Sequence, residues 1–261
     1  MPSASPIAIV PGEPRGRVLI KGLLAHFERV RHQRWMALDF PEEWIRSRPA
    51  VQAIALEDTG RATALEHIAL DLMAPADENT QRLLGILAQI EQDPTLPVRE
   101  CHLEVSLALG LIPARLDLRL FEKGLRGWCV RHIDSAPEGT SMHVITIAGT
   151  AVRLQLDKNR CPGERGRLSL LFADPPTDFS TAVSDRLQAR LSTLMASPAD
   201  RQVLLFEKHN RLWGAGHLRT ELEASFEFPD LSRVHEIWMV DVTAPASAHD
   251  ATFRRVLPAD E

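Results

Sequence analysis

Two short runs of the sequence place carboxylate and imidazole groups side by side, a combination suited to acid–base or metal chemistry. Glu66-His67 lies in a run that reads as a strand, and Glu207-Lys208-His209 follows the apolar run that ends at Phe206. Functional groups are common at the ends of such strands in α/β sheets. The sequence favours simpler interpretations. Glu66 and His67 would point to opposite faces of a strand, and residues 207–209 would form a solvated strand end.

Four arginines are candidate nucleic-acid-binding residues. Arg29, Arg31 and Arg34 precede Trp35, so basic groups could meet phosphates beside an aromatic ring that is available for stacking. Arg165 lies in the basic, glycine-bearing loop 159–167, which could hold a nucleic-acid backbone. Exposed arginines are usually only solvated, and the loop is more simply a hairpin connection. The partner expected is therefore a nucleic acid or another protein.

Several well-defined catalytic motifs do not occur in the sequence. It has no Gly-x-Ser-x-Gly elbow, no Walker loop and no His-Glu-x-x-His, which removes support for a serine hydrolase, a P-loop NTPase or a zincin. Gly214-Ala215-Gly216 lacks the third glycine of a dinucleotide site. The three cysteines, Cys101, Cys129 and Cys161, form neither a CxxC pair nor a disulfide framework.

Composition indicates an ordinary soluble globular protein. The 261 residues carry a formal net charge of −5, which argues against a general nucleic-acid coat protein but leaves a local basic cleft open. Hydrophobic residues make up 44% of the chain, enough for a core. The sequence has no long apolar run and no signal peptide, so we expect no membrane partner and a cytoplasmic location.

The hydrophobic pattern predicts an α/β protein with a central mixed sheet flanked by helices. The sheet is expected to contain strands 51–57, 62–70, 202–206 and 236–242, with helices 18–38 and 77–92 packed on it. Further helices are predicted over 113–133 and 181–195, and further strands over 101–109, 142–148, 152–156 and 167–172. No clear linker interrupts the pattern. We therefore expect a flexible segment 1–16, a single domain 17–246 and a loose C-terminal tail 247–261.

Three segments together resemble a known superfamily. Residues 48–68, 203–207 and 234–241, the last containing Ile237-Trp238-Met239-Val240-Asp241, are similar to bacterial proteins of the PD-(D/E)XK, or restriction-endonuclease-like, superfamily. The resemblance covers about a fifth of the chain. It implies a Pro-Asp pair entering one strand, a hairpin, and Glu-x-Lys or Glu-x-Thr on the next strand. Such enzymes cleave phosphodiesters with Mg²⁺ held by the two carboxylates, while the lysine positions water and offsets charge.

The sequence departs from this motif at two of its positions. Glu66 matches the motif glutamate and is the candidate catalytic and metal-binding residue, but Ala50 follows Pro49 and Ile68 occupies the lysine position. We therefore expect a restriction-endonuclease-like fold with a degraded catalytic set, serving as a non-catalytic binding or structural module, with no cofactor. The alternative is a divergent Mg²⁺-dependent nuclease acting on DNA or RNA, in which a carboxylate such as Glu57, Asp71 or Glu207 joins Glu66. A chance match on an unrelated α/β protein also stays open.

Overall fold

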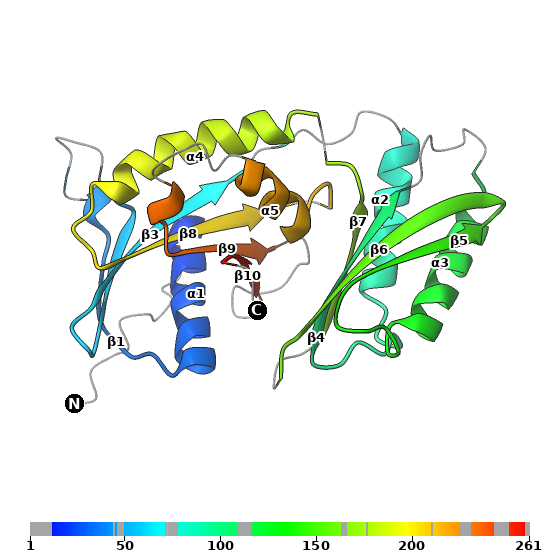
Figure 1. Cartoon of the computed structure of the whole chain (residues 1–261), viewed down its shortest axis with the longest axis horizontal. Helices are drawn as coiled ribbons and strands as arrows, with labels where there is room; N and C mark the ends of the chain where they lie inside the picture. Colours follow the sequence, from blue (N-terminus) through cyan, green and yellow to red (C-terminus); the bar gives the residue numbers. More distant parts are fainter. Residues whose placement is uncertain are drawn as a thin grey trace. The chain divides into compact units, whose positions relative to one another are not determined.

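A computed structural model describes residues 12–43, 45, 50–70, 72, 78–108, 116–162, 166–175, 177–209, 211–224, 231–242 and 251–258. The chain divides into two compact units (Figure 1). Unit 1 comprises Met1–Leu72, Thr177–Asn210 and Ala215–Glu261, and unit 2 comprises Met73–Pro176 and Arg211–Gly214. This differs from the single domain predicted for residues 17–246, because each unit has its own sheet and its own hydrophobic cluster.

Unit 1 is built on a six-stranded mixed sheet with the order β1-β2-β3-β8-β9-β10. The first three strands form an antiparallel meander, β3, β8 and β9 are parallel, and β10 runs antiparallel to β9. The strand bounds are β1 Trp35–Asp39, β2 Ala53–Glu57, β3 Ala62–Ala69, β8 Arg201–Lys208, β9 Glu236–Asp241 and β10 Thr252–Leu257. All four strands predicted for the central sheet lie in it, which confirms that prediction.

Helices cover both faces of the unit 1 sheet. Helix α1 (Arg15–Arg31) packs its apolar stripe on Leu65, Val203 and Leu205. Glu66 follows Leu65 and points to the opposite face, toward α4 (Phe179–Met195). Helix α5 (Ala215–Ala224) contacts β10, and short 3₁₀ turns occur at Pro41–Glu43 and Leu231–Arg233. Unit 1 is thus an α/β unit whose central strands are buried on both sides.

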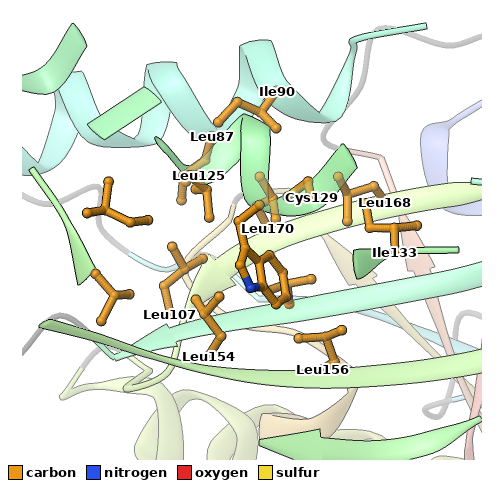
Figure 2. Close-up of a cluster of buried hydrophobic side chains, with 14 of the residues drawn as sticks. Leu87, Ile90, Leu107, Leu125, Cys129, Ile133, Leu154, Leu156, Leu168 and Leu170 are labelled. Carbon is orange, nitrogen blue, oxygen red and sulfur yellow. The ribbon is translucent and has the colours of Figure 1, made fainter. Parts of the chain in front are cut away.

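Unit 2 has a four-stranded sheet in the order β5-β6-β4-β7, covered by helices on one face. Leucines from β4, β6 and β7 meet the apolar stripes of both helices, as Figure 2 shows. Helix α2 was expected on the central sheet, but it packs on β7 of unit 2 instead. The bounds are α2 Glu78–Glu91, β4 Cys101–Ala108, α3 Leu118–His132, β5 Gly139–Ile147, β6 Thr150–Arg160 and β7 Arg167–Phe172.

Two predicted boundaries are wrong, the first because of a local turn of the backbone and the second because of a strand pairing. The first helix ends at Arg31, where His32 takes a left-handed conformation with φ 57°, and the chain continues as β1 rather than as helix to residue 38. The tail predicted to be loose contains β10, because Phe253 and Val256 are buried and β10 pairs with β9. Of the predicted flexible segment 1–16, residues 1–11 lie outside the described residues, and Arg15 already begins α1.

Within the described ranges, every helix is too short or too polar to cross a membrane.

Candidate functional site

Glu66, the candidate catalytic residue, lies in β3 and is completely buried. Its Oε1 accepts a hydrogen bond from the backbone N–H of Gln52 at 3.1 Å, just before β2. Its Oε2 accepts one from Nη1 of Arg190 on α4 at 3.3 Å. The Arg190 side chain is 44% exposed, so the ion pair joins a buried carboxylate to the protein surface. Both carboxylate oxygens of Glu66 are therefore occupied within the chain.

The protonation of Glu66 is set mainly by its burial. Burial raises the pKa of Glu66 from an ordinary 4.5 to about 7, against the opposing effects of Arg190 and the Gln52 N–H, and the negative charge of Glu42 raises it slightly further. This carboxyl group titrates near neutral pH. A pKa in this range occurs in catalytic acids, but also in carboxyl groups buried for structural reasons.

The residues around Glu66 do not complete the motif of the resembled family. Ile68, two residues along the same strand face, is buried and offers no cation or ligand. Glu57 contacts Gln33 and Thr59 and Glu207 contacts His67, so neither pairs with Glu66. Asp71 lies outside the described residues, as does Pro49. In the part of the chain that the structure describes, no three His, Cys, Asp or Glu side chains are grouped so that they could hold a metal ion.

Glu207 forms a second polar cluster on the α1 face of the same sheet, which we call the Glu207 cluster (Glu207, His67, Arg15 and His209). Nε2 of His67 lies 2.9 Å from Glu207 Oε2, Nε of Arg15 donates to Oε1, and Nδ1 of His209 lies 3.6 Å from Oε1. The Glu207 side chain is 1% exposed. Burial alone would raise the pKa of Glu207, but the hydrogen bond and charges of its neighbours outweigh burial and lower it. The cluster therefore surrounds an ionised carboxylate with donors.

The Glu207 cluster lies at the carboxyl ends of the parallel strands β3 and β8, beside the first turn of α1. A Cβ at Gly16 would come within 2.9 Å of both His67 Nδ1 and Gln52 Nε2, so α1 packs closely on the imidazole. In this packing, Glu207 orients His67. The solvated strand end expected at residues 207–209 is wrong for Glu207 and Lys208, since both are buried. Lys208 points to the other face and donates to Asp241 Oδ2 at 3.0 Å.

The arginines proposed for nucleic-acid binding do not form one surface. Arg31 donates to Glu236 at 3.0 Å, and its guanidinium lies 4.5 Å from the centroid of the Phe27 ring. Arg29 is exposed and contacts His26 within α1, whereas Arg34 is exposed in the connection after the helix. Arg165 lies outside the described residues. Trp35 is buried and donates to Leu24 O at 3.1 Å, so it offers no stacking surface.

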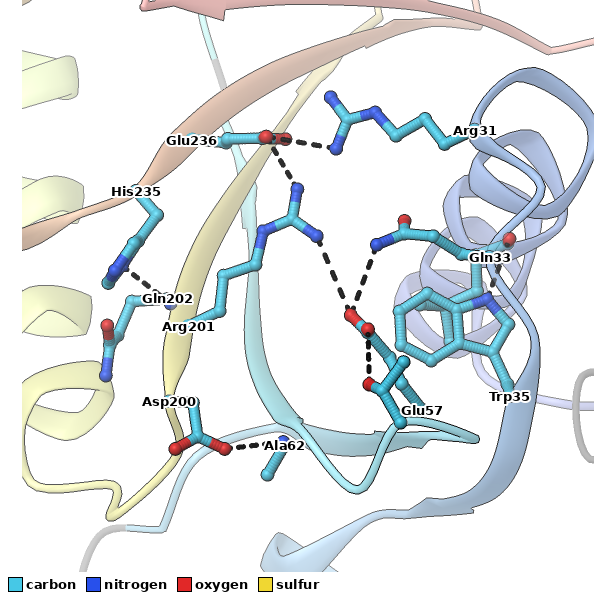
Figure 3. A network of polar contacts seen from close by, with 12 residues as sticks. Arg31, Gln33, Trp35, Glu57, Ala62, Asp200, Arg201, Gln202, His235 and Glu236 are labelled. Atoms are coloured by element: carbon cyan, nitrogen blue, oxygen red, sulfur yellow. Dashed lines mark hydrogen bonds and ion pairs between the residues drawn. The ribbon is translucent and has the colours of Figure 1, made fainter.

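Arg31 instead belongs to a buried polar network between α1 and the amino ends of β8 and β9 (Figure 3). Arg201 lies 2.6 Å from Glu236 Oε1 and 4.0 Å from Glu57 Oε1. Trp238 donates to Glu236 Oε2 at 2.7 Å. Burial would raise the pKa of Glu236, but the hydrogen bonds from Arg31 and Trp238 and the charge of Arg201 hold it below its ordinary value. The network is internally compensated and fixes α1 to the sheet.

Sequence reasoning missed the partners of the buried acids. Arg190 is separated from Glu66 by 124 positions, which include the segment Met73–Pro176 of unit 2, so no local pattern connects them. The contact of Glu207 with His67 depends on the parallel register that pairs Ala69 with Glu207. The uniformly apolar run before Glu207 was the available signal, since it marks a strand buried on both faces.

Searches against protein-family models, curated proteins and solved structures found no match to this chain.

Proposed function

We propose that the chain is a non-catalytic binding module whose unit 1 is restriction-endonuclease-like, with a structural ion pair at the former catalytic glutamate. The observation that carries this proposal is the enclosure of Glu66, which has no exposed surface and gives both oxygens to Gln52 and Arg190. A carboxylate that binds Mg²⁺ needs lone pairs directed at a shared site with other oxygen ligands.

The hairpin geometry supports the family part of the proposal. Strands β2 and β3 pair antiparallel through a turn at residues 58–60, and Glu66 lies on the second strand, where the resembled motif has its glutamate. Ile68 is on the same face, where the motif has lysine. In this proposal the hairpin that carries the motif is retained, but the side chains that would bind Mg²⁺ and position water are lost.

We favour a protein as the partner over a nucleic acid. Among the four candidate arginines, Arg31 is paired with Glu236 inside unit 1, and Arg29 and Arg34 are not on one helix face. A nucleic-acid surface needs several cations aligned on the phosphates. The exposed apolar side chains Met142 and Val144 of unit 2 suit a protein partner better.

One observation favours the alternative of a divergent nuclease. The negative charge of Glu42 contributes to the raised pKa of Glu66, so a second carboxylate acts electrostatically on the first. In this alternative, Arg190 would release Glu66 and serve as the cation that Ile68 cannot supply.

Nuclease assays distinguish these two functions. The full chain is incubated with plasmid, linear duplex, and single-stranded DNA and RNA in Mg²⁺ or Mn²⁺, beside Glu66→Ala and Glu66→Gln. The matched control is Glu207→Gln, which changes a buried carboxylate on the opposite face. We expect no cleavage above that of Glu66→Ala. Cleavage by the wild type and by Glu207→Gln that disappears in both Glu66 variants would establish the nuclease and overturn our proposal.

A further inference from the structure

Strand β5 of unit 2 is an exposed sheet edge without the features that usually protect one. It occupies the end of the strand order β5-β6-β4-β7, so its outer side has no partner among the described strands. Its nine residues, Gly139-Thr-Ser-Met-His-Val-Ile-Thr-Ile147, include no Lys, Arg, Asp, Glu or Pro. Natural edge strands are commonly blunted by such residues, by bulges or by short length. The pairing of β5 with β6 is continuous from Gly139 to Ile147, with no register shift.

Four side chains of β5 lie on the solvent-facing side of the sheet. Thr140, Met142, Val144 and Thr146 are all exposed, with Met142 at 64% and Val144 at 74%. Large apolar side chains at this exposure, next to each other on one strand, are a feature of contact surfaces.

The hairpin turn shows which backbone groups of β5 do not bond to β6. Ala148 and Gly149 have φ values of 49° and 77° and connect Ile147 to Thr150 as a two-residue turn with both residues left-handed. The pair that closes such a turn is hydrogen-bonded, and bonded pairs alternate along the ladder. The odd residues of β5 therefore bond to β6, and residues 140, 142, 144 and 146 direct their N–H and C=O groups outward.

The same four residues form a pattern that is symmetric about His143. Read in either direction from His143, the strand shows an exposed apolar residue and then an exposed threonine. An antiparallel copy of β5 related by a two-fold axis at His143 would place Met142 opposite Val144 of the copy and Thr140 opposite Thr146 of the copy. Threonine pairs and apolar pairs are favourable across antiparallel strands, and the backbone groups of β5 that do not bond to β6 would meet as bonded pairs.

We propose that β5 is a homodimerisation edge, at which two copies of the chain join their unit 2 sheets into one continuous eight-stranded sheet. The partner is a second copy because the edge is complementary to itself: it is neutral and symmetric, as an isologous two-fold contact requires. This inference concerns unit 2 alone and holds whether or not Glu66 takes part in catalysis.

The first test is the mass of the full chain in solution. Light scattering coupled to size exclusion, over a micromolar concentration series, is expected to give twice the chain mass for the wild type. Val144→Lys places a charge at the centre of the edge and is expected to give the mass of one chain. The matched control is Gln155→Lys, which adds the same charge on β6 beside Met142, on the same exposed face but not at the edge, and keeps the dimer.

A cysteine series tests the register. In a Cys161→Ser background, His143→Cys would bring two cysteines together across the two-fold axis, where unbonded antiparallel pairs have Cα atoms about 4.5 Å apart, within disulfide range. Ser141→Cys is the matched control, because its copies would lie about 13 Å apart along the strand. We expect oxidation to cross-link His143→Cys alone. A monomeric wild type, a dimer unchanged by Val144→Lys, or cross-linking of Ser141→Cys in place of His143→Cys would each overturn the proposal; the first would leave a strand of another protein as the occupant.

Discussion

Strand β9 of unit 1 and strand β5 of unit 2 have opposite environments, although both are rich in β-forming residues. All six residues of β9 are buried, between β8 and β10 in the strand order. Only Ile147 of β5 is buried, and among the strands that the structure describes only β6 lies beside β5. The polar groups of β9 pair within the chain, as Glu236 does with Arg201 and Arg31. Strand β9 thus has polar side chains that pair within the chain, whereas β5 has backbone groups that, in our proposal, pair with a second copy of the chain.

This difference matters for function because buried acids were the obvious candidates for chemistry. Glu66, Glu207 and Glu236 are buried, and each has a cationic or imidazole partner from another element of unit 1. Burying a carboxylate is costly unless it is paired and hydrogen-bonded. In our proposal these acids are part of the packing of unit 1, and the neutral edge of unit 2 is the surface that binds a second copy of the chain.

The largest difference in stability between substitutions in β9 and in β5 is expected at Trp238 of β9. Its side chain is buried and packs edge-on against Phe27, with ring centroids 5.2 Å apart. We expect Trp238→Ala to lower the free energy of unfolding by about 3–5 kcal/mol, because it empties a large aromatic site and removes the donor to Glu236. Val144→Ala on β5 is the control, with an expected change within about 0.5 kcal/mol in the monomeric chain. Urea unfolding followed by circular dichroism measures both, and a Trp238→Ala loss below about 1 kcal/mol would show that β9 is not a core strand.

The pH dependence of stability gives the next largest effect. Glu66 has a pKa near 7 in the folded chain and an ordinary value of 4.5 when exposed, so the folded chain binds more protons between these pH values. The contribution of Glu66 to the free energy of unfolding is therefore largest below pH 4.5. It is lost as pH rises through about 7, and the total loss is about 3 kcal/mol. Glu66→Gln is expected to remove this slope from a series of urea unfolding curves.

Glu207 provides a control of opposite sign for that slope. Its pKa is lowered in the folded chain, so its contribution to stability is present above the ordinary pKa and is lost as pH falls through the depressed value. Glu207→Gln should therefore leave the slope between pH 4.5 and 7 in place and alter only the acid limb. An unchanged slope in Glu66→Gln would contradict the assignment of the raised pKa.

Gly124 tests how tightly α3 packs on the sheet of unit 2. A Cβ at this position would lie 2.5 Å from Cγ2 of Ile147, so Gly124→Ala is expected to destabilise by about 1–3 kcal/mol through overpacking. Gly85→Ala in α2, where nothing lies within 4 Å of the new Cβ, is expected to stabilise by about 0.5–1 kcal/mol through helix propensity. Thermal unfolding of the two variants checks the contrast, and equal effects would show that the helical face of unit 2 is loosely packed.

The smallest effect is expected at the turn after β5. Ala148 adopts φ 49°, a left-handed conformation that asparagine tolerates better than alanine and that two-residue hairpin turns favour in the sequence Asn-Gly. Ala148→Asn should raise stability by about 0.5–1 kcal/mol. Ala151→Asn, an exposed position within β6, should give no such gain, and a destabilised Ala148→Asn would mean that the hairpin has a different turn.

Much of the local structure could be predicted from the sequence. The run 62–70 and the uniform apolar runs at 202–206 and 236–242 were predicted as strands of one sheet, and all three lie in it. Gly60 and Gly149, with φ values of 84° and 77°, each lie in the turn between two strands of a hairpin. These features depend on periodicity and on glycine conformation, which act over a few residues.

Other boundaries depend on contacts that no local pattern contains. Residues 252–257 were expected to be loose, but pairing with β9 and the burial of Phe253 make them a strand. The periodicity of α2 was recognised, but not that the helix packs on β7 in a second unit. An amphipathic stripe shows which face of a helix is buried, but not which sheet covers it.

The sequence by itself determined that Glu66 and His67 would face opposite sides of a strand and that Ile68 would share the face of Glu66, because side chains alternate along a strand whatever surrounds it. Only the tertiary structure decided that Glu66 pairs with Arg190 and that His67 meets Glu207. Those partners come from segments more than 100 residues away, brought together by the parallel pairing of β3 with β8 and the packing of α4 on β3. The chemistry available to a carboxylate depends on its neighbours and its burial, and both are properties of the folded chain.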